Sequence, residues 1–439
     1  MNFHKKFNLS QSILKLNEKH PIIGKPVLIW GRMLFRIKLI LSTKCLQYRY
    51  RFKYGKLDLN KIYFVSPKRF QFYLINNRFF KWNNSLRILD GDWDFTKNPY
   101  EELISHQTIK GIFKEGKRWD ETKLYYILPD KIKNGKKIWT FKNEEARDRW
   151  FTQTEQLYKK IKKYGYKSQQ ELYSFINRLA PKKWSPVLDE ITAAIDRDGQ
   201  FLFINGKHRL AIAKVLDIPE IPVVVLIRHK KWLEFRKELI EFSKRTPQNK
   251  LNFCFAHPDL QDIPSLYDDS CFQIINQNKS VTQGIFLDIS PDLGIFCHKF
   301  EDIGFKCYAI EEDRSSDYFL KKIKIIENKD FTIISNEFLN NSVNKDLIFD
   351  IALNLNFSQL IDERDENFEM FMKIINKIKV KELFVGFSES RISIDKNNDQ
   401  NFNPEKMVDF IKERSYFNAA TLIGKSVNEI KIYKIFLKD

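Results

Sequence analysis

Five consecutive residues, Asn205-Gly206-Lys207-His208-Arg209, combine residue types that bind and act on phosphate groups. They lie between an alternating apolar stretch and a second apolar stretch, which predicts a strand, a glycine turn and a helix. The first N–H groups of a helix are unpaired at its positive end and attract anions. Lys207 adds charge, Arg209 offers two-pronged contact to oxygen atoms, and His208 can donate or transfer a proton. The five residues predict a phosphate-binding turn, with His208 as a candidate catalytic residue. A plain strand-to-helix turn with surface cations is the alternative.

Carboxylates that could serve this turn occur elsewhere in the chain. The sequence DGDWD places Asp90, Asp92 and Asp94 at alternate positions of a predicted short strand and acidic turn, residues 86–94. Alternate residues of an extended segment share one face, and clustered carboxylate oxygens suit a Mg²⁺ ion that bridges phosphates. An ordinary solvated acidic turn is the alternative. We therefore predict these three residues as metal ligands, and Asp90, Asp92 and Glu190 as catalytic candidates beside His208.

The surrounding pattern supplies the elements that would position these groups. Residues 191–195 and 201–204 read as two strands joined by an Asp-Gly hairpin turn. A helix over 210–216, a strand over 222–227 and a charged helix over 231–244 follow, and 61–66 reads as an earlier strand. Residues 98–180 are predicted to be helical, with one helix from 143 to 164.

Residues 195–229, IDRDGQFLFINGKHRLAIAKVLDIPEIPVVVLIRH, resemble the core of the ParB/sulfiredoxin-like superfamily. In that superfamily a Gly-x-(His or Arg)-Arg turn before a helix binds nucleotide phosphates. The resemblance implies a nucleoside triphosphate or diphosphate with Mg²⁺ at Asn205–Arg209. Lys207 stands where sulfiredoxin chemistry needs a cysteine, which excludes that chemistry. Asn205 stands where the family's kinases carry an acid, so phosphate binding is implied more strongly than phosphate transfer.

A second constellation lies in residues 286–312, FLDISPDLGIFCHKFEDIGFKCYAIEE. One predicted strand ends at Asp288 and the next at Glu311, and Gly294 lies in the loop before the intervening helix. In open parallel sheets, ligands bind at the carboxyl ends of strands. A carboxylate there can accept hydrogen bonds from both hydroxyls of a ribose, and a glycine lets the backbone approach a ligand.

Residues 284–439 alternate strands and helices and close with an antiparallel pair near 418–437, which predicts a doubly wound sheet. This region resembles class I S-adenosylmethionine-dependent methyltransferases, whose first motif is Asp-x-Gly-x-x-x-Gly. Ser290 stands in place of the first glycine of that motif. The resemblance implies S-adenosylmethionine as cofactor, held by a set of six residues: Asp288, Ser290, Asp292, Gly294, Glu311 and Asn354. A methyltransferase-like fold that binds no cofactor is the alternative.

The net charge of +19 is concentrated at one end of the 439-residue chain. Residues 1–80 carry 17 Lys and Arg but two acids, so the remaining residues are nearly balanced. The five cysteines show no CxxC spacing, which favours a reducing cytoplasm over a disulfide framework. Residues 28–41 are apolar with interspersed cations, which suits a helix docked on the protein core or one lying on an anionic membrane surface.

These patterns predict an α/β and α+β multidomain protein. A basic helical segment, 1–58, precedes a small mixed-sheet ParB/sulfiredoxin-like domain, 59–245, with its helical insertion at about 98–180. A linker, 246–278, leads to a doubly wound Rossmann-like methyltransferase domain, 279–439. The first functional hypothesis is a cytoplasmic enzyme, free or peripheral on the inner membrane, that methylates a small-molecule or glycan substrate in surface polymer assembly. Its central domain would bind a nucleotide, with or without a kinase-like or nucleotidase activity. A nucleotide-regulated nucleic-acid-binding protein and an inactive scaffold are the alternatives.

Overall fold

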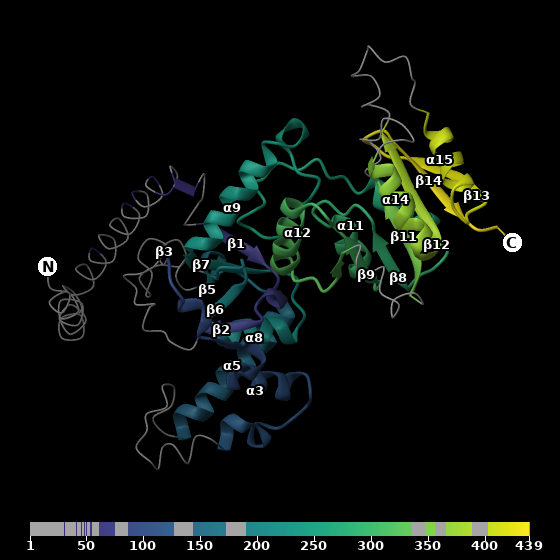
Figure 1. Cartoon of the computed structure of the whole chain (residues 1–439). Helices are drawn as coiled ribbons and strands as arrows, with labels where there is room; N and C mark the ends of the chain where they lie inside the picture. Colours follow the sequence, from purple (N-terminus) through teal and green to yellow (C-terminus); the bar gives the residue numbers. More distant parts are fainter. Residues whose placement is uncertain are drawn as a thin grey trace. The chain divides into compact units, whose positions relative to one another are not determined.

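The computed structural model describes residues 61–74, 87–126, 144–172, 190–335, 347–355, 366–388 and 403–438, together with scattered residues between 30 and 54. The chain divides into two compact units, Met1–Glu238 (unit 1) and Leu239–Asp439 (unit 2) (Figure 1). Most of the predicted basic segment 1–58, including the predicted membrane-surface helix 28–41, lies outside the described residues. Within the described part of the chain, no helix is both long enough and apolar enough to cross a membrane.

Unit 1 contains a mixed sheet in the order β1-β7-β5-β6-β2-β4, with β3 pairing along β7. The hairpin predicted around the Asp-Gly turn is confirmed, because β5 and β6 pair antiparallel and Gly199 has a φ of 82°. β5 also pairs in parallel with β7, so β5 lies inside the sheet and is buried along its whole length. The strands are β1 (Ile62–Val65), β2 (Phe72–Leu74), β3 (Arg87–Leu89), β4 (Lys97–Pro99), β5 (Ile191–Ile195), β6 (Phe201–Asn205) and β7 (Ile221–His229).

The helices of unit 1 follow the sequence pattern closely. α5 ends at Tyr164, before the predicted stop at Gly165, where φ is 75°. Apolar residues of α3, α5 and α8 pack together in one cluster around Ile109, Ile161 and Ile212. The helices are α3 (Ile104–Phe113), α5 (Glu144–Tyr164), α6 (Gln169–Leu172), α8 (Lys207–Val215) and α9 (Lys230–Ser243), with short 3-10 turns η1 (Pro67–Arg69), η4 (Trp93–Phe95), η5 (Tyr100–Glu102) and η6 (Trp119–Glu121).

Unit 2 contains a second mixed sheet, in the order β10-β9-β8-β11-β12-β14-β13. The first five strands in this order pair in parallel, and the last two pairings are antiparallel. The predicted doubly wound sheet with an antiparallel closing pair is therefore confirmed. The strands are β8 (Ile285–Asp288), β9 (Lys306–Ile310), β10 (Thr332–Ile334), β11 (Ile348–Asn354), β12 (Lys379–Ser388), β13 (Ala419–Lys425) and β14 (Ile430–Phe436).

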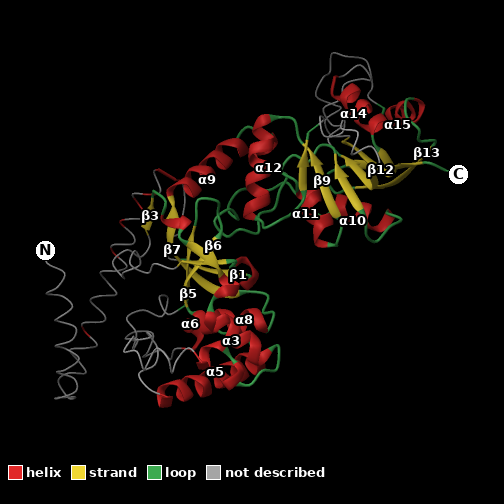
Figure 2. Cartoon of the chain, turned by 60° about the horizontal axis from the view of Figure 1, so that its bottom comes forward, coloured by secondary structure: helices red, strands yellow, loops and turns green. Residues whose placement is uncertain are grey.

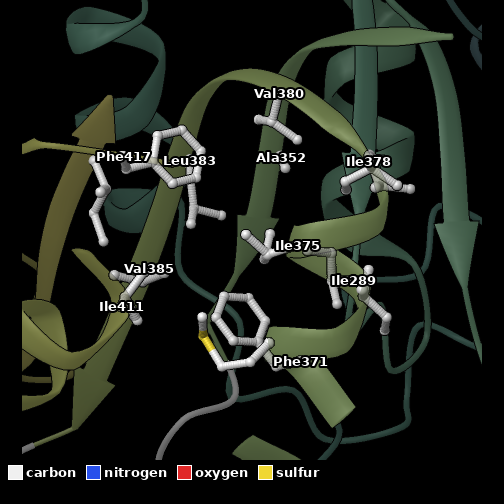
Figure 3. Packing of buried hydrophobic residues seen from close by; sticks show 14 of the residues in the cluster. Ile289, Ala352, Phe371, Ile375, Ile378, Val380, Leu383, Val385, Ile411 and Phe417 are labelled. Atoms are coloured by element: carbon white, nitrogen blue, oxygen red, sulfur yellow. The ribbon is translucent and has the colours of Figure 1, made fainter. Parts of the chain in front are cut away.

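Helices cover both faces of this sheet, with α10 and α11 on one side and α14 and α15 on the other (Figure 2). Successive residues of β8 face opposite sides, because Phe286 stacks on Phe300 of α11 while Leu287 joins the cluster formed with α14 and α15. Figure 3 shows part of this cluster. The helices are α10 (Ser270–Asn278), α11 (Ile295–Asp302), α12 (Arg314–Ile326), α14 (Glu366–Lys377) and α15 (Pro404–Glu413), preceded by the 3-10 turn η8 (Pro247–Asn249).

The prediction of a linker over residues 246–278 is wrong. Side chains from 251 to 257 alternate between buried and exposed, and Leu251, Phe253 and His257 are almost fully buried. Phe253 contacts Phe255 and His298 with ring centroids 4.7 and 5.0 Å apart. Prolines at 247, 258 and 264 gave the segment a linker-like composition, but its alternate residues pack into unit 2. The folded unit therefore begins before residue 279, the predicted domain boundary.

We predict that Phe253→Ala will destabilise unit 2 by about 3–5 kcal/mol, because it leaves a cavity beside α11. The neighbouring change Asn252→Ala alters an exposed side chain and should cost at most about 0.5 kcal/mol. Hydrogen–deuterium exchange of β8 and α11 in the full chain measures the difference. Equal protection in the two variants would show that the segment contributes no packing energy.

Candidate functional site

The predicted phosphate-binding turn joins β6 to α8. Asn205 is the exposed last residue of β6 and pairs with Thr192 of β5. Gly206 precedes the first turn of α8 with φ 98° and ψ 28°, a left-handed conformation that favours glycine. A Cβ atom on Gly206 would lie 2.9 Å from Ile191 Cγ1, so a larger residue would also collide with β5. Gly206 has no side chain with which to cap the helix, and the start of a helix is its positive end, which favours an anion.

Two cations of the turn are partly buried against unit 1. Burial lowers the pKa of Lys207 to about 8. An Arg209 nitrogen lies 3.7 Å from an oxygen of Glu190, whose carboxylate is fully buried and accepts a hydrogen bond from the Gln169 backbone. Burial also raises the pKa of Tyr166 to about 12, against the effect of nearby Arg209. This ion pair suits a role for Glu190 in positioning Arg209, and its role as a base or metal ligand stays a prediction.

His208 of the same turn points toward the helical insertion. Trp150 of α5 donates a hydrogen bond from Nε1 to His208 Nε2 over 3.0 Å. Burial, together with the positive charges of Lys207 and Arg209, lowers the pKa of His208 to about 4. His208 is therefore a neutral imidazole at physiological pH.

The predicted three-carboxylate metal site is not formed. Arg197 donates hydrogen bonds to both oxygens of Asp94 and to Asp92, while Lys230 donates to Asp90. Within the described ranges, no group of three potential ligands converges on a metal position. Arg197 follows β5 whereas Glu190 precedes it, so the acidic turn and the phosphate turn lie at opposite ends of a strand spanning about 16 Å. The sequence pattern did not predict that Arg197 contacts these carboxylates, because Arg197 is more than 100 residues away along the chain.

In unit 2, three predicted cofactor residues meet at one edge of the sheet. β9, β8 and β11 run in parallel side by side, and they carry Glu311, Asp288 and Asn354 at or just beyond their carboxyl ends. Asp288 and Asn354 are buried. The Ser290 N–H donates to Asp288 Oδ1 at 3.3 Å, whereas the buried Oδ2 has no partner among the described residues. The arrangement confirms that these residues share an edge and leaves one carboxylate oxygen to be satisfied.

Burial raises the pKa values of the carboxyl groups at this edge of the sheet. Burial raises the pKa of Asp288 to about 8, and the charges of Glu311 and Asp292 add to the effect. Burial likewise raises the pKa of Glu311 to about 7 and that of Asp292 to about 6. A ligand that brings positive charge or hydrogen-bond donors would stabilise the ionised forms.

The loop from Ser290 to Gly294 turns tightly into α11. The Gly294 N–H donates to the Pro291 carbonyl at 2.7 Å, and Asp292 adopts a positive φ of 53°. Gly294 has a φ of 83°, and a Cβ atom there would lie 2.6 Å from Leu320 Cδ1. Gly294 thus serves the turn and the packing of α11 against α12, and the approach of a ligand to its backbone stays a prediction. Ser290, which stands in place of the first glycine of the methyltransferase motif, donates its backbone N–H to Asp288.

Comparison with protein-family models and with curated protein sequences finds no match. Several solved structures are similar to part of the chain. The PH0226 protein from Pyrococcus horikoshii OT3 is 13% identical over 39% of this chain and 89% of that chain, with a TM-score of 0.29. A putative S-adenosyl-L-methionine-dependent methyltransferase from Methanococcus maripaludis is 15% identical. The match covers 38% of this chain and 83% of that chain, with a TM-score of 0.29. The bifunctional kinase-methyltransferase WbdD is 13% identical. The match covers 45% of this chain and 46% of that chain, with a TM-score of 0.32.

The partial similarity is to solved structures that include S-adenosylmethionine-dependent methyltransferases. The sequence reasoning missed two residues of the unit 1 site, Trp150 and Tyr166, which reach the turn from the helical insertion. Their only sequence signal was an aromatic residue on a helix or just after it, a pattern common to structural cores.

We predict that Asp94→Asn will lower the stability of unit 1 by about 3 kcal/mol at pH 7, because Arg197 loses its buried partner. Burial alone would raise the pKa of Asp94, but the hydrogen bonds from Arg197 outweigh it and lower that pKa. The stabilisation is therefore present above the unfolded pKa of about 4 and is lost as the pH falls through the folded value.

Asp92→Asn is the matched control, since the Asp92 side chain is 74% exposed and that of Asp94 is 2% exposed. Chemical unfolding should give Asp94→Asn a lower free energy of unfolding than Asp92→Asn at pH 7, and the difference should shrink at pH 3. A stabilisation of the wild type by added Mg²⁺ that Asp94→Asn abolishes would restore the metal-site hypothesis.

Proposed function

We propose that unit 2 is an S-adenosylmethionine-dependent methyltransferase and that unit 1 binds the phosphates of a nucleotide. The observation that carries the first part is the buried Oδ2 of Asp288, which has no partner in the described ranges and lies beside Glu311 at the carboxyl edge of a parallel sheet. An isolated buried carboxylate is costly, and a bound cation removes much of that cost. The cofactor brings an ammonium group and two ribose hydroxyls, which match the acceptors that this edge offers.

The residues present fit the cofactor in charge and in hydrogen-bonding capacity. Asp288 would hold the ammonium group, and Glu311 would accept hydrogen bonds from the ribose hydroxyls. Asn354, at the end of β11, supplies an amide at the same edge. When bound, S-adenosylmethionine supplies an electrophilic methyl group. The protein's contribution is to fix the position of that group against the acceptor and to keep water out.

The second part of the proposal rests on the turn at Asn205–Arg209. Its support is the left-handed Gly206 at the start of α8, with Lys207 and Arg209 in the first turn of that helix. The low pKa of Lys207 follows from burial, so a bound phosphate would raise it and gain binding energy from the restored charge. We extend the ParB/sulfiredoxin-like resemblance to unit 1 on this basis.

We predict that S-adenosylmethionine will bind more tightly as the pH rises from 6 to 7.5, by at least about tenfold. The cofactor binds the ionised carboxylates, whose pKa values lie between about 6 and about 8 in its absence. Binding should therefore release protons at pH 7. Calorimetry in buffers of different ionisation enthalpy measures this release directly.

Glu311→Gln should weaken this binding and reduce the number of protons released. Glu312→Gln, which changes the next residue along the chain, is the matched control and should change neither quantity. Binding without proton release, or with proton uptake, would contradict the assignment of these carboxylates to a cationic ligand.

We predict that the two ligands will stabilise the protein independently. A nucleotide or S-adenosylmethionine at about 100 times its dissociation constant should each add about 2.7 kcal/mol to the unit that binds it. Lys207→Met keeps the buried stem without the charge, so the variant should fold normally yet lose most of the nucleotide effect. A thermal-shift panel with nucleotides, Mg²⁺ and S-adenosylmethionine on the full chain makes the measurement.

Glu311→Gln gives the reciprocal control, because it should lose the cofactor effect and keep the nucleotide effect. Loss of both effects in either variant would argue against separate sites. If no nucleotide stabilises the wild type, the proposal for unit 1 fails while that for unit 2 stands.

A further inference from the structure

The helical insertion contacts the phosphate turn through one directional interaction. Trp150 is almost fully buried on α5, and its Nε1–H donates to Nε2 of His208 over 3.0 Å. The two rings are nearly perpendicular, with an interplanar angle of 72° and centroids 4.9 Å apart. His208 lies in the first turn of α8, two residues after Gly206. A tryptophan from a separate helix therefore orients a side chain of the turn.

This hydrogen bond determines which nitrogen of His208 carries the proton. An indole N–H can only donate, so Nε2 must be the acceptor and the proton lies on Nδ1. A charged imidazole would place one N–H against another, and the neighbouring cations Lys207 and Arg209 also oppose protonation. Nδ1 has no hydrogen-bond partner among the described residues and is not fully buried. Its N–H group is therefore available to a ligand.

Trp150 is itself held in place by its neighbours. Its ring lies edge-to-face against Trp119 at 5.9 Å and against Phe151 at 5.3 Å. Trp119 donates a hydrogen bond from its own Nε1–H to Glu155 of α5 over 2.7 Å. The two tryptophans thus belong to one aromatic cluster but direct their N–H groups to different acceptors.

We propose that Trp150 is a positioning residue that holds His208 in the Nδ1–H tautomer, so that His208 serves as a neutral hydrogen-bond donor to a phosphate oxygen. This proposal rests on the proposed phosphate binding by unit 1. It replaces the predicted role of His208 in proton transfer, since Nε2 is occupied by Trp150 and cannot accept a proton from a substrate. It also gives the helical insertion a function, because Trp150 of this insertion would determine which His208 nitrogen can donate a hydrogen bond to the ligand.

Nitrogen NMR of the full chain labelled with ¹⁵N-histidine tests the tautomer. The spectrum contains signals from seven histidines, and those lost in His208→Gln identify His208. The wild type should show a protonated Nδ1 and an unprotonated Nε2 for His208 at pH 7. Trp150→Phe should shift His208 toward the Nε2–H tautomer, whereas Trp119→Phe should leave its signals in place.

Binding of inorganic pyrophosphate to the same proteins tests the role of the donor. Trp150→Phe should weaken pyrophosphate binding by about tenfold, the change expected for one hydrogen bond to an anion. Trp119→Phe removes a tryptophan N–H from the same cluster, so it controls for general loosening of α5 and should change the affinity less than twofold.

Each outcome decides a different part of the proposal. A wild-type His208 protonated on Nε2 overturns it outright. The expected tautomer with unchanged affinity in Trp150→Phe, or an equal loss in Trp119→Phe, overturns the role of the donor. If pyrophosphate does not bind the wild type although the tautomer is as expected, the proposed phosphate function of unit 1 fails, and the donor role fails with it.

Discussion

Buried carboxylates constrain the chemistry of both units. Such a charge is tolerated only with a partner, or else it gives up its charge by a shift in pKa. In unit 1 the buried Asp94 has its partner within the chain, because Arg197 contacts both of its oxygens. In unit 2 the buried Asp288 lacks such a partner on Oδ2 among the described residues, and its pKa rises to about 8. The first arrangement is complete in itself, whereas the second leaves one oxygen that the proposed cofactor would satisfy.

This difference separates two groups of acids that look alike in the sequence. Asp90, Asp92 and Asp94 are closer together in the chain than Asp288 and Glu311 are, and they have the denser negative charge. Yet their charges are balanced by Arg197 and Lys230, which the hairpin and the start of α9 supply. The spacing of acids along the chain is therefore a weaker guide to a binding site than the presence or absence of a cation across the fold.

Local pattern was sufficient for most elements and insufficient for the contacts between them. The Asp-Gly hairpin, the turn at Gly206 and the strands of unit 2 follow from alternation and glycine placement, which are local properties. Residues 251–257 carried the same alternation, but the surrounding prolines favoured a linker and their burial could not be read from composition. The contacts of Arg197 with Asp94 and of Trp150 with His208 join residues that are far apart in the sequence. No periodicity encodes such contacts, because they depend on how the sheet and the insertion pack.

The two proposed sites share a left-handed glycine at the start of a helix, but the side chains around them have opposite charge. In each, a strand leads to a left-handed glycine, Gly206 with φ 98° or Gly294 with φ 83°, and a helix starts without a side-chain cap. The first turn of α8 then carries Lys207 and Arg209, so the field of the helix and the side chains both favour an anion. The first turn of α11 is apolar, and the carboxylates at the ends of β8 and β9 dominate the charge nearby. Because both helices start from a left-handed glycine, the difference in charge between the two proposed sites comes from their side chains.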